Sequence, residues 1–125
     1  MKWTIDYAKA EGFVRVKTSG QRCLEDRKKL GKEVLSAGRK KHVNAFLLDQ
    51  KDTAFGLSVL EIDRLALLLR DIGFSAKDRM AILLNQGSLK NSLFRFLHDV
   101  LSLCSLKIQV FSDTQEAAAW LKAKS

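Results

Sequence analysis

Residues 43–49, Val-Asn-Ala-Phe-Leu-Leu-Asp, decide the fold of this 125-residue chain. A second run of the same kind is Arg-Met-Ala-Ile-Leu-Leu, residues 79–84. Short apolar runs that do not alternate with polar residues are typical of strands buried on both faces, as in a parallel sheet. The two runs therefore predict two central strands of an α/β domain.

Helical periodicity fills the segments around these strands. Residues 21–38 repeat apolar side chains at helical spacing, and Gly38 is expected to stop that helix. Residues 57–72 are too long for a strand and predict a helix that ends at Gly73. Another helix is expected after Gly87, with Ser88 as its N-cap.

The two ends of the chain add three strands and one helix. Residues 3–7 and 13–18 alternate with period two, which predicts an antiparallel hairpin that Ser19-Gly20 ends. Residues 106–111 predict a last strand, and Asp113 with Glu116 resembles a capping box at the start of a final helix.

The expected order is β-β-α-β-α-β-α-β-α, an α/β fold with a mostly parallel five-stranded sheet, an antiparallel first strand and four helices. The chain has no proline and no linker-like stretch, so residues 1–125 are expected to form a single domain. If the strands lie side by side in chain order, right-handed crossovers place their helices on one face. The other face would then be open to a partner or a ligand.

The chain is basic, with a formal net charge of +8. The excess gathers in residues 27–42, which contain Arg27, Lys28, Lys29, Lys32, Arg39, Lys40, Lys41 and His42. Such a cluster attracts acidic partners. Residues 21–42 contain no aromatic side chain to stack on bases, so nucleic-acid binding is disfavoured and an acidic protein is the expected partner.

Several functional classes find no support in the sequence. No apolar run is long enough for a membrane span, and Asp6 interrupts any apolar signal-peptide centre, so no membrane insertion is expected. Two cysteines make no disulfide framework, which favours a reducing cytoplasm. No nucleophile–base set, no metal-ligand spacing and no cofactor-binding glycine motif is present, so we expect no catalytic residue, no metal, no cofactor and no enzymatic activity.

Two further features are candidates for binding. The turn Asn85-Gln86-Gly87-Ser88 follows a buried strand and precedes a helix, where open α/β sheets bind ligands or anions. The helices over 57–72 and 88–104 carry more apolar residues than one buried stripe needs. A protein interface or a homodimer is therefore expected at Leu60, Leu67, Phe94 and Leu101.

The element order, the aspartate that closes the central strand and the ending Val-Phe-Ser-Asp-Thr-Gln-Glu-Ala-Ala-Ala-Trp-Leu, residues 110–121, resemble the SpoIIAA-like (STAS/SEC14-like) family. The resemblance covers essentially the whole chain. It implies a small one-domain α/β fold, usually bacterial and cytoplasmic.

The resemblance also implies two alternative functions. Anti-sigma-factor antagonists carry an Asp-Ser-Ser-Gly motif whose serine is phosphorylated, and Ser58 lies at about that position. Leu57, Val59 and Leu60 replace the flanking residues of the motif. SEC14-like relatives suggest instead a carrier of a small lipophilic ligand. The first interpretation remains a non-enzymatic binding or regulatory module that acts through protein–protein contact.

Overall fold

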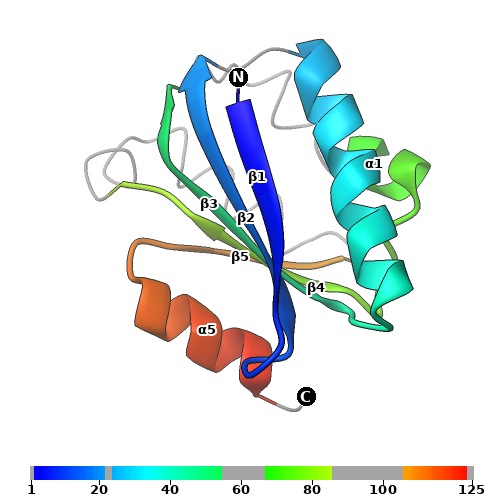
Figure 1. Cartoon of the computed structure of the whole chain (residues 1–125), viewed down its shortest axis with the longest axis vertical. Coiled ribbons are helices and arrows are strands. Elements are labelled where there is room, and N and C mark those ends of the chain that lie inside the picture. The colour runs from blue at the N-terminus through cyan, green and yellow to red at the C-terminus, as the bar shows by residue number, and fades with distance from the viewer. Residues whose placement is uncertain (1, 22–23, 55–66, 86–105, 124–125) are drawn as a thin grey trace.

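The computed structural model describes residues 2–21, 24–54, 67–85 and 106–123, which form a sheet with helices packed on both of its faces (Figure 1). The strands are β1 (Lys2–Ala8), β2 (Phe13–Gln21), β3 (Ala45–Ala54), β4 (Arg79–Leu83) and β5 (Lys107–Phe111). The helical segments among these residues are α1 (Leu24–Lys40), residues 67–72, and α5 (Thr114–Lys122). The expected helix over 88–104 lies outside the described residues.

The sheet has the strand order β1-β2-β3-β4-β5. β1 runs antiparallel to β2, whereas β2, β3, β4 and β5 are parallel to one another. The hairpin turns where the carbonyl oxygen of Ala8 accepts hydrogen bonds from the backbone N–H groups of Glu11 and Gly12, at 3.0 and 2.8 Å. Gly12 has φ of 77°, which few other residues adopt readily. The predicted mixed sheet with an antiparallel first strand is confirmed.

Successive side chains of the central strands enter two different cores. Phe46 and Leu48 of β3 point to the side of α1, where they pack with Leu30 and Val34. Leu47, between them, points to the side of α5 and packs with Leu121. Because β3 is buried on both faces of the sheet, its apolar residues 45–48 do not alternate with polar ones.

The face opposite α1 is not open, contrary to the expectation from sequence. Ala117 and Leu121 of α5 are buried against it, together with Ala81 and Leu83 of β4. The crossover rule concerns helices that join two parallel strands of one sheet, and within the described residues α5 joins no such pair. The rule holds for α1 and residues 67–72, since Leu30 and Leu69 belong to the same core.

The prediction that Gly38 ends the first helix is wrong. α1 continues to Lys40. A Cβ atom on Gly38 would lie 2.6 Å from two ring atoms of Phe46, so this position needs glycine for close packing against β3. The chain leaves the helix at His42, which has φ of 56°, and the N–H of Val43 donates to the carbonyl oxygen of Gly38 at 2.9 Å.

Two strands are longer than the sequence had indicated. β2 continues through Ser19 and Gly20, after a register shift, and β3 continues beyond Asp49 to Ala54. The two polar extensions pair with each other, Ser19 with Asp52, so backbone hydrogen bonding rather than burial extends them. The described end of the helix expected over 57–72 is confirmed at Gly73, whose φ is 125°.

The last helix begins where the sequence placed it. Asp113 is the N-cap of α5, and its carboxylate accepts a hydrogen bond from the N–H of Gln115 at 3.1 Å. Trp120 packs on Phe111 with ring centroids 5.8 Å apart. The guanidinium of Arg79 lies 4.5 Å from the Trp120 ring centroid and donates to the carbonyl oxygen of Ala123. The end of α5 is thereby joined to the start of β4.

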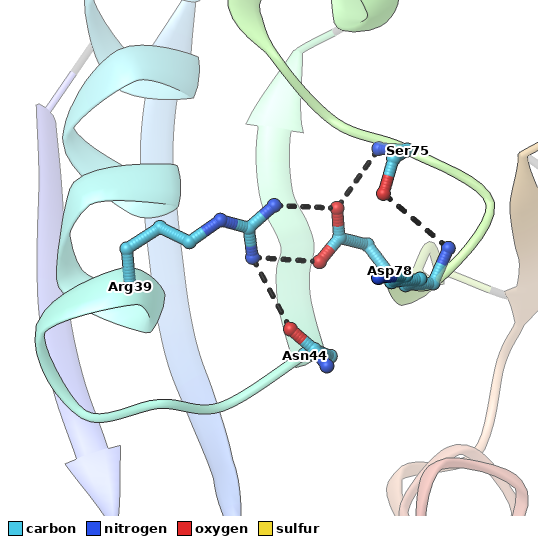
Figure 2. Close-up of polar contacts among 5 residues, drawn as sticks. Arg39, Asn44, Ser75 and Asp78 are labelled. Atoms are coloured by element: carbon cyan, nitrogen blue, oxygen red, sulfur yellow. Dashed lines mark hydrogen bonds and ion pairs between the residues drawn. The ribbon is translucent and has the colours of Figure 1, made fainter.

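An ion pair with a buried carboxylate joins the end of α1 to the same end of β4 (Figure 2). Asp78, just before β4, is 4% exposed, and both its oxygens accept hydrogen bonds from the Arg39 guanidinium at 2.9 Å. Arg39 also donates to the side chain of Asn44, and the N–H of Ser75 donates to Asp78. The hydrogen bond to Asp78 raises the pKa of Arg39 above its ordinary value, despite partial burial, so the arginine remains charged.

Alanine at Gly38 and at Gly31 should affect stability differently, although both glycines lie within α1. Gly38→Ala presses a methyl group against the fully buried ring of Phe46 and should lower the free energy of unfolding by about 1–3 kcal/mol. Gly31→Ala meets only Cδ1 of Ile72, the movable end of a side chain, and gains about 0.5–1 kcal/mol of helix propensity. Urea unfolding measures both; equal stability of the two variants would contradict the packing role of Gly38.

Removal of the guanidinium from the ion pair should destabilise the fold. In Arg39→Gln the buried carboxylate of Asp78 loses its charged partner, and we expect a loss of about 2 kcal/mol. Lys77→Gln is the control, because its exposed side chain has no ion pair within the described residues, and it should change stability by less than about 0.5 kcal/mol. The same small change in both variants, measured by urea unfolding, would show that the pair contributes little.

Candidate functional site

Two of the site residues predicted from sequence fall within the described part of the chain. Asn85 is exposed and follows the end of β4. Leu67 is 57% exposed, although it belongs to a helical segment whose Leu69 is buried. The remaining predicted site residues lie outside the described residues: Ser58, Leu60, Gln86, Gly87, Ser88, Phe94 and Leu101.

The carboxyl end of β3 carries charged side chains that largely neutralise one another. The ammonium nitrogen of Lys17 lies 3.7 Å from a carboxylate oxygen of Asp52. The ammonium nitrogen of Lys51 lies 3.9 Å from a carboxylate oxygen of Asp49. Asp49 also accepts a hydrogen bond from the N–H of Lys51 at 3.2 Å. The strand order contains no reversal among β2 to β5, so the crevice that usually binds ligands at such a reversal does not form between these strands. Within the described residues, the charges at this end of β3 therefore balance.

The described residues form neither a metal site nor a cavity for a lipophilic ligand. No group of three His, Cys, Asp or Glu side chains gathers there as a metal site would require. A cavity lies between Leu69, Phe74, Met80 and Ile108, but its volume of about 10 Å³ has room for one water molecule at most. That cavity is too small for a lipophilic ligand. Among the described helices none is long and apolar enough to cross a membrane.

A larger hollow lies between α1 and β1. This groove has a volume of about 550 Å³, within the range of small-ligand sites. Its apolar surface comes from Ile5, Val14 and Ala37, and its polar rim includes Lys32 and Lys40. The groove therefore joins an apolar floor to basic side chains, on residues that come from β1, β2 and α1.

Two contacts connect β1 to α1 and to the residue that follows α1. Near the start of β1 the indole N–H of Trp3 donates to the carboxylate of Glu33 at 3.2 Å. Near its end the ammonium of Lys41 lies 5.8 Å from the ring centroid of Tyr7. Glu33 is the one acidic side chain that α1 contributes to the lining, and β1 contributes a second, Asp6. The side chain of Tyr7 is partly accessible to solvent, with an exposure of 37%.

The exposed side of α1 carries lysines without acidic partners. Lys29, Lys32, Ser36 and Lys40 follow one another at spacings of three and four residues, which places them in one row along the helix. Within the described ranges no carboxylate forms an ion pair with Lys28 or with the three lysines of this row. The lining of the groove itself holds Lys32, Lys40 and Lys41 together with the carboxylates of Asp6 and Glu33, so basic side chains outnumber acidic ones there and favour an anionic group.

The sequence contained the parts of this groove but not their juxtaposition. The alternation of Trp3, Ile5 and Tyr7 was used to predict a strand, and the basic cluster was interpreted apart from it. The absence of aromatic residues from 21–42 seemed to separate the lysines from any aromatic contact, yet β1 supplies Trp3 and Tyr7 beside them. The signal that could have found the site is the antiparallel hairpin, which brings β1 next to the strand that α1 covers.

Comparisons with known proteins bear on the fold. No protein-family model matches the sequence, and no curated protein matches it significantly. The structure is similar to the crystal structure of an uncharacterised protein of the DUF3478 family, which has a SpoIIAA-like fold and comes from Shewanella loihica PV-4. The TM-score is 0.57 and the sequence identity 22%, over 96% of this chain and 92% of that chain. This chain therefore has a SpoIIAA-like α/β fold, as the resemblance of its sequence implied.

Proposed function

We propose that this protein is a non-enzymatic binding module, which holds an acidic protein partner at the groove between α1 and β1. The single observation that supports this most directly is the combination of an apolar floor with the rim lysines Lys32 and Lys40, which form no ion pair within the described residues. Apolar surface supplies affinity when it is buried, and complementary charge speeds the encounter and selects the partner. The module is expected in a bacterial cytoplasm, as the family resemblance implies.

The other functions considered from sequence gain less support. A carrier of a lipophilic ligand needs an apolar cavity, and the small cavity beside Leu69 is too small for one. A phosphoswitch depends on Ser58, which lies outside the described residues. Both remain proposals that the groove neither requires nor opposes.

A second candidate is a homodimer built on the predicted apolar interface. Leu67 favours it, because a leucine that is 57% exposed beside a buried core is a contact that a second copy could cover. This interface and the groove involve different residues, so the two proposals can be tested independently.

A cross-linking experiment tests the acidic partner. With a photo-reactive phenylalanine analogue at Ser36, which lines the groove, we expect a discrete protein adduct in cells of the source organism. Adding Lys32→Glu should reduce the adduct about tenfold, because reversing one rim charge changes binding by roughly 1 kcal/mol or more. Adding Lys77→Glu, an exposed lysine before β4, should leave the adduct unchanged. No adduct, or equal loss in both variants, would contradict the proposal.

The homodimer predicts a concentration-dependent mass. Sedimentation velocity at high micromolar concentration should detect a dimer of the unmodified chain, and Leu67→Lys should shift it to monomer by placing a charge in the apolar contact. Gln115→Lys, on the exposed side of α5, is the matched control. A monomer of the unmodified chain at that concentration would exclude the dimer.

A further inference from the structure

Resting on the proposed function, we infer that the partner is recognised as an extended acidic segment that adds to the outer edge of β1 as a sixth strand. One row of its side chains would then enter the groove under α1. The inference concerns the conformation of the partner and the backbone groups that hold it, which the proposed function leaves open.

The outer edge of β1 is the part of the sheet to which the segment would add. β1 lies at one end of the strand order, and within the described residues no strand pairs with its outer side. Its pairing with β2 runs without a register shift from Lys2 opposite Ser19 to Ala8 opposite Phe13. In such a regular antiparallel pair every second residue directs its N–H and C=O away from the partner strand. β1 therefore offers an ordered row of backbone donors and acceptors.

Within the described residues, the outer edge of β1 has few of the features that protect edge strands. Edge strands are commonly shielded by proline, by a bulge, by many charged residues or by short length. β1 has seven residues, no proline and no bulge, and its charged residues are Lys2 and Asp6. An edge of this kind is a template for strand addition, a recurring mode of peptide recognition.

The groove lies beside β1, on the side of the sheet that α1 covers. An added strand would lie about 4.8 Å from β1, and alternate side chains would point toward the α1 side of the sheet. On that side Ile5 and Tyr7 of β1 line the groove, below Lys32 and Lys40 of α1. The added side chains would thus meet apolar surface near the sheet and ammonium groups beyond it.

The lysines of α1 favour an acidic peptide in the groove. The row of Lys29, Lys32 and Lys40 has no carboxylate partner within the described part of the chain, and Lys41 lies over Tyr7. Glutamates that face α1 would supply the missing charges. A polynucleotide would also satisfy the charges, but it would leave the backbone groups of β1 unused, so we favour an acidic peptide.

Synthetic peptides test the mode of binding. The probe is a fluorescent nonapeptide, Thr-Glu-Val-Glu-Val-Glu-Val-Glu-Thr, whose alternate residues place all its glutamates on one side of a strand. Two derivatives carry N-methyl groups on either the odd or the even amides, so that each blocks the hydrogen bonds of one edge. We expect one derivative to bind at least about tenfold more weakly than the probe and the other to bind like it.

Two variants and one internal reference complete the experiment. Lys40→Glu should weaken the probe about tenfold, whereas Lys77→Glu should not, and circular dichroism checks that both fold. Hydrogen exchange should slow at backbone amides of β1 when the probe binds, while amides of β5, at the opposite edge of the sheet, serve as the reference.

The outcomes separate the inference from the proposed function. If both N-methyl derivatives bind equally, or the probe does not bind up to about 1 mM, strand addition is wrong, while a lysine-dependent adduct at Ser36 would still support the module. Tighter binding of a helical Glu/Ala peptide of the same charge, of oligo-deoxythymidine or of anionic vesicles would overturn the extended acidic peptide as the occupant. Loss of the adduct together with the absence of peptide binding would overturn both.

Discussion

The contact between Arg39 and Asp78 determines where α1 lies, and much of the rest follows from that position. The guanidinium in the last turn of α1 is held by a buried carboxylate just before β4, and Asn44 and Ser75 complete the polar cluster. Because β4 lies on the far side of β3 from β1, this contact holds the end of the helix toward the middle of the sheet. The close approach of Gly38 to Phe46 acts in the same direction.

α1 packs mainly on β2, with further contacts to β1 and β3, and it covers β1 incompletely. The side chains of β2 and β3 beneath α1, such as Val16 and Phe46, are fully buried, whereas Ile5 and Tyr7 of β1 remain partly or largely accessible. The groove is therefore the space left between a fixed helix and an edge strand, bridged by the Trp3 and Tyr7 contacts. Packing of α1 that stabilises the core thus also creates the candidate site.

Sequence reasoning succeeded where burial is strong and local. The apolar runs of β3 and β4, the alternation of the hairpin and the capping residue Asp113 each have one dominant physical cause, and the structure confirms all of them. It failed at Gly38, because a glycine that stops a helix and one that admits a neighbouring ring look alike in sequence. It also stopped β2 and β3 too early, since the pairing of Ser19 with Asp52 depends on the register of a distant strand.

The candidate site was harder to predict because no segment contains it. The strand at the start of the chain has no reason, taken alone, to lie beside the lysines of α1, and the ion pair that places α1 joins residues 39 positions apart. The position of β1 at the edge is likewise a property of the whole strand order, since an order with a second strand beside β1 would have covered that edge. A binding surface of this kind lies at the edge of the hydrophobic core. The sequence indicates which residues form the core more directly than it indicates where the core ends.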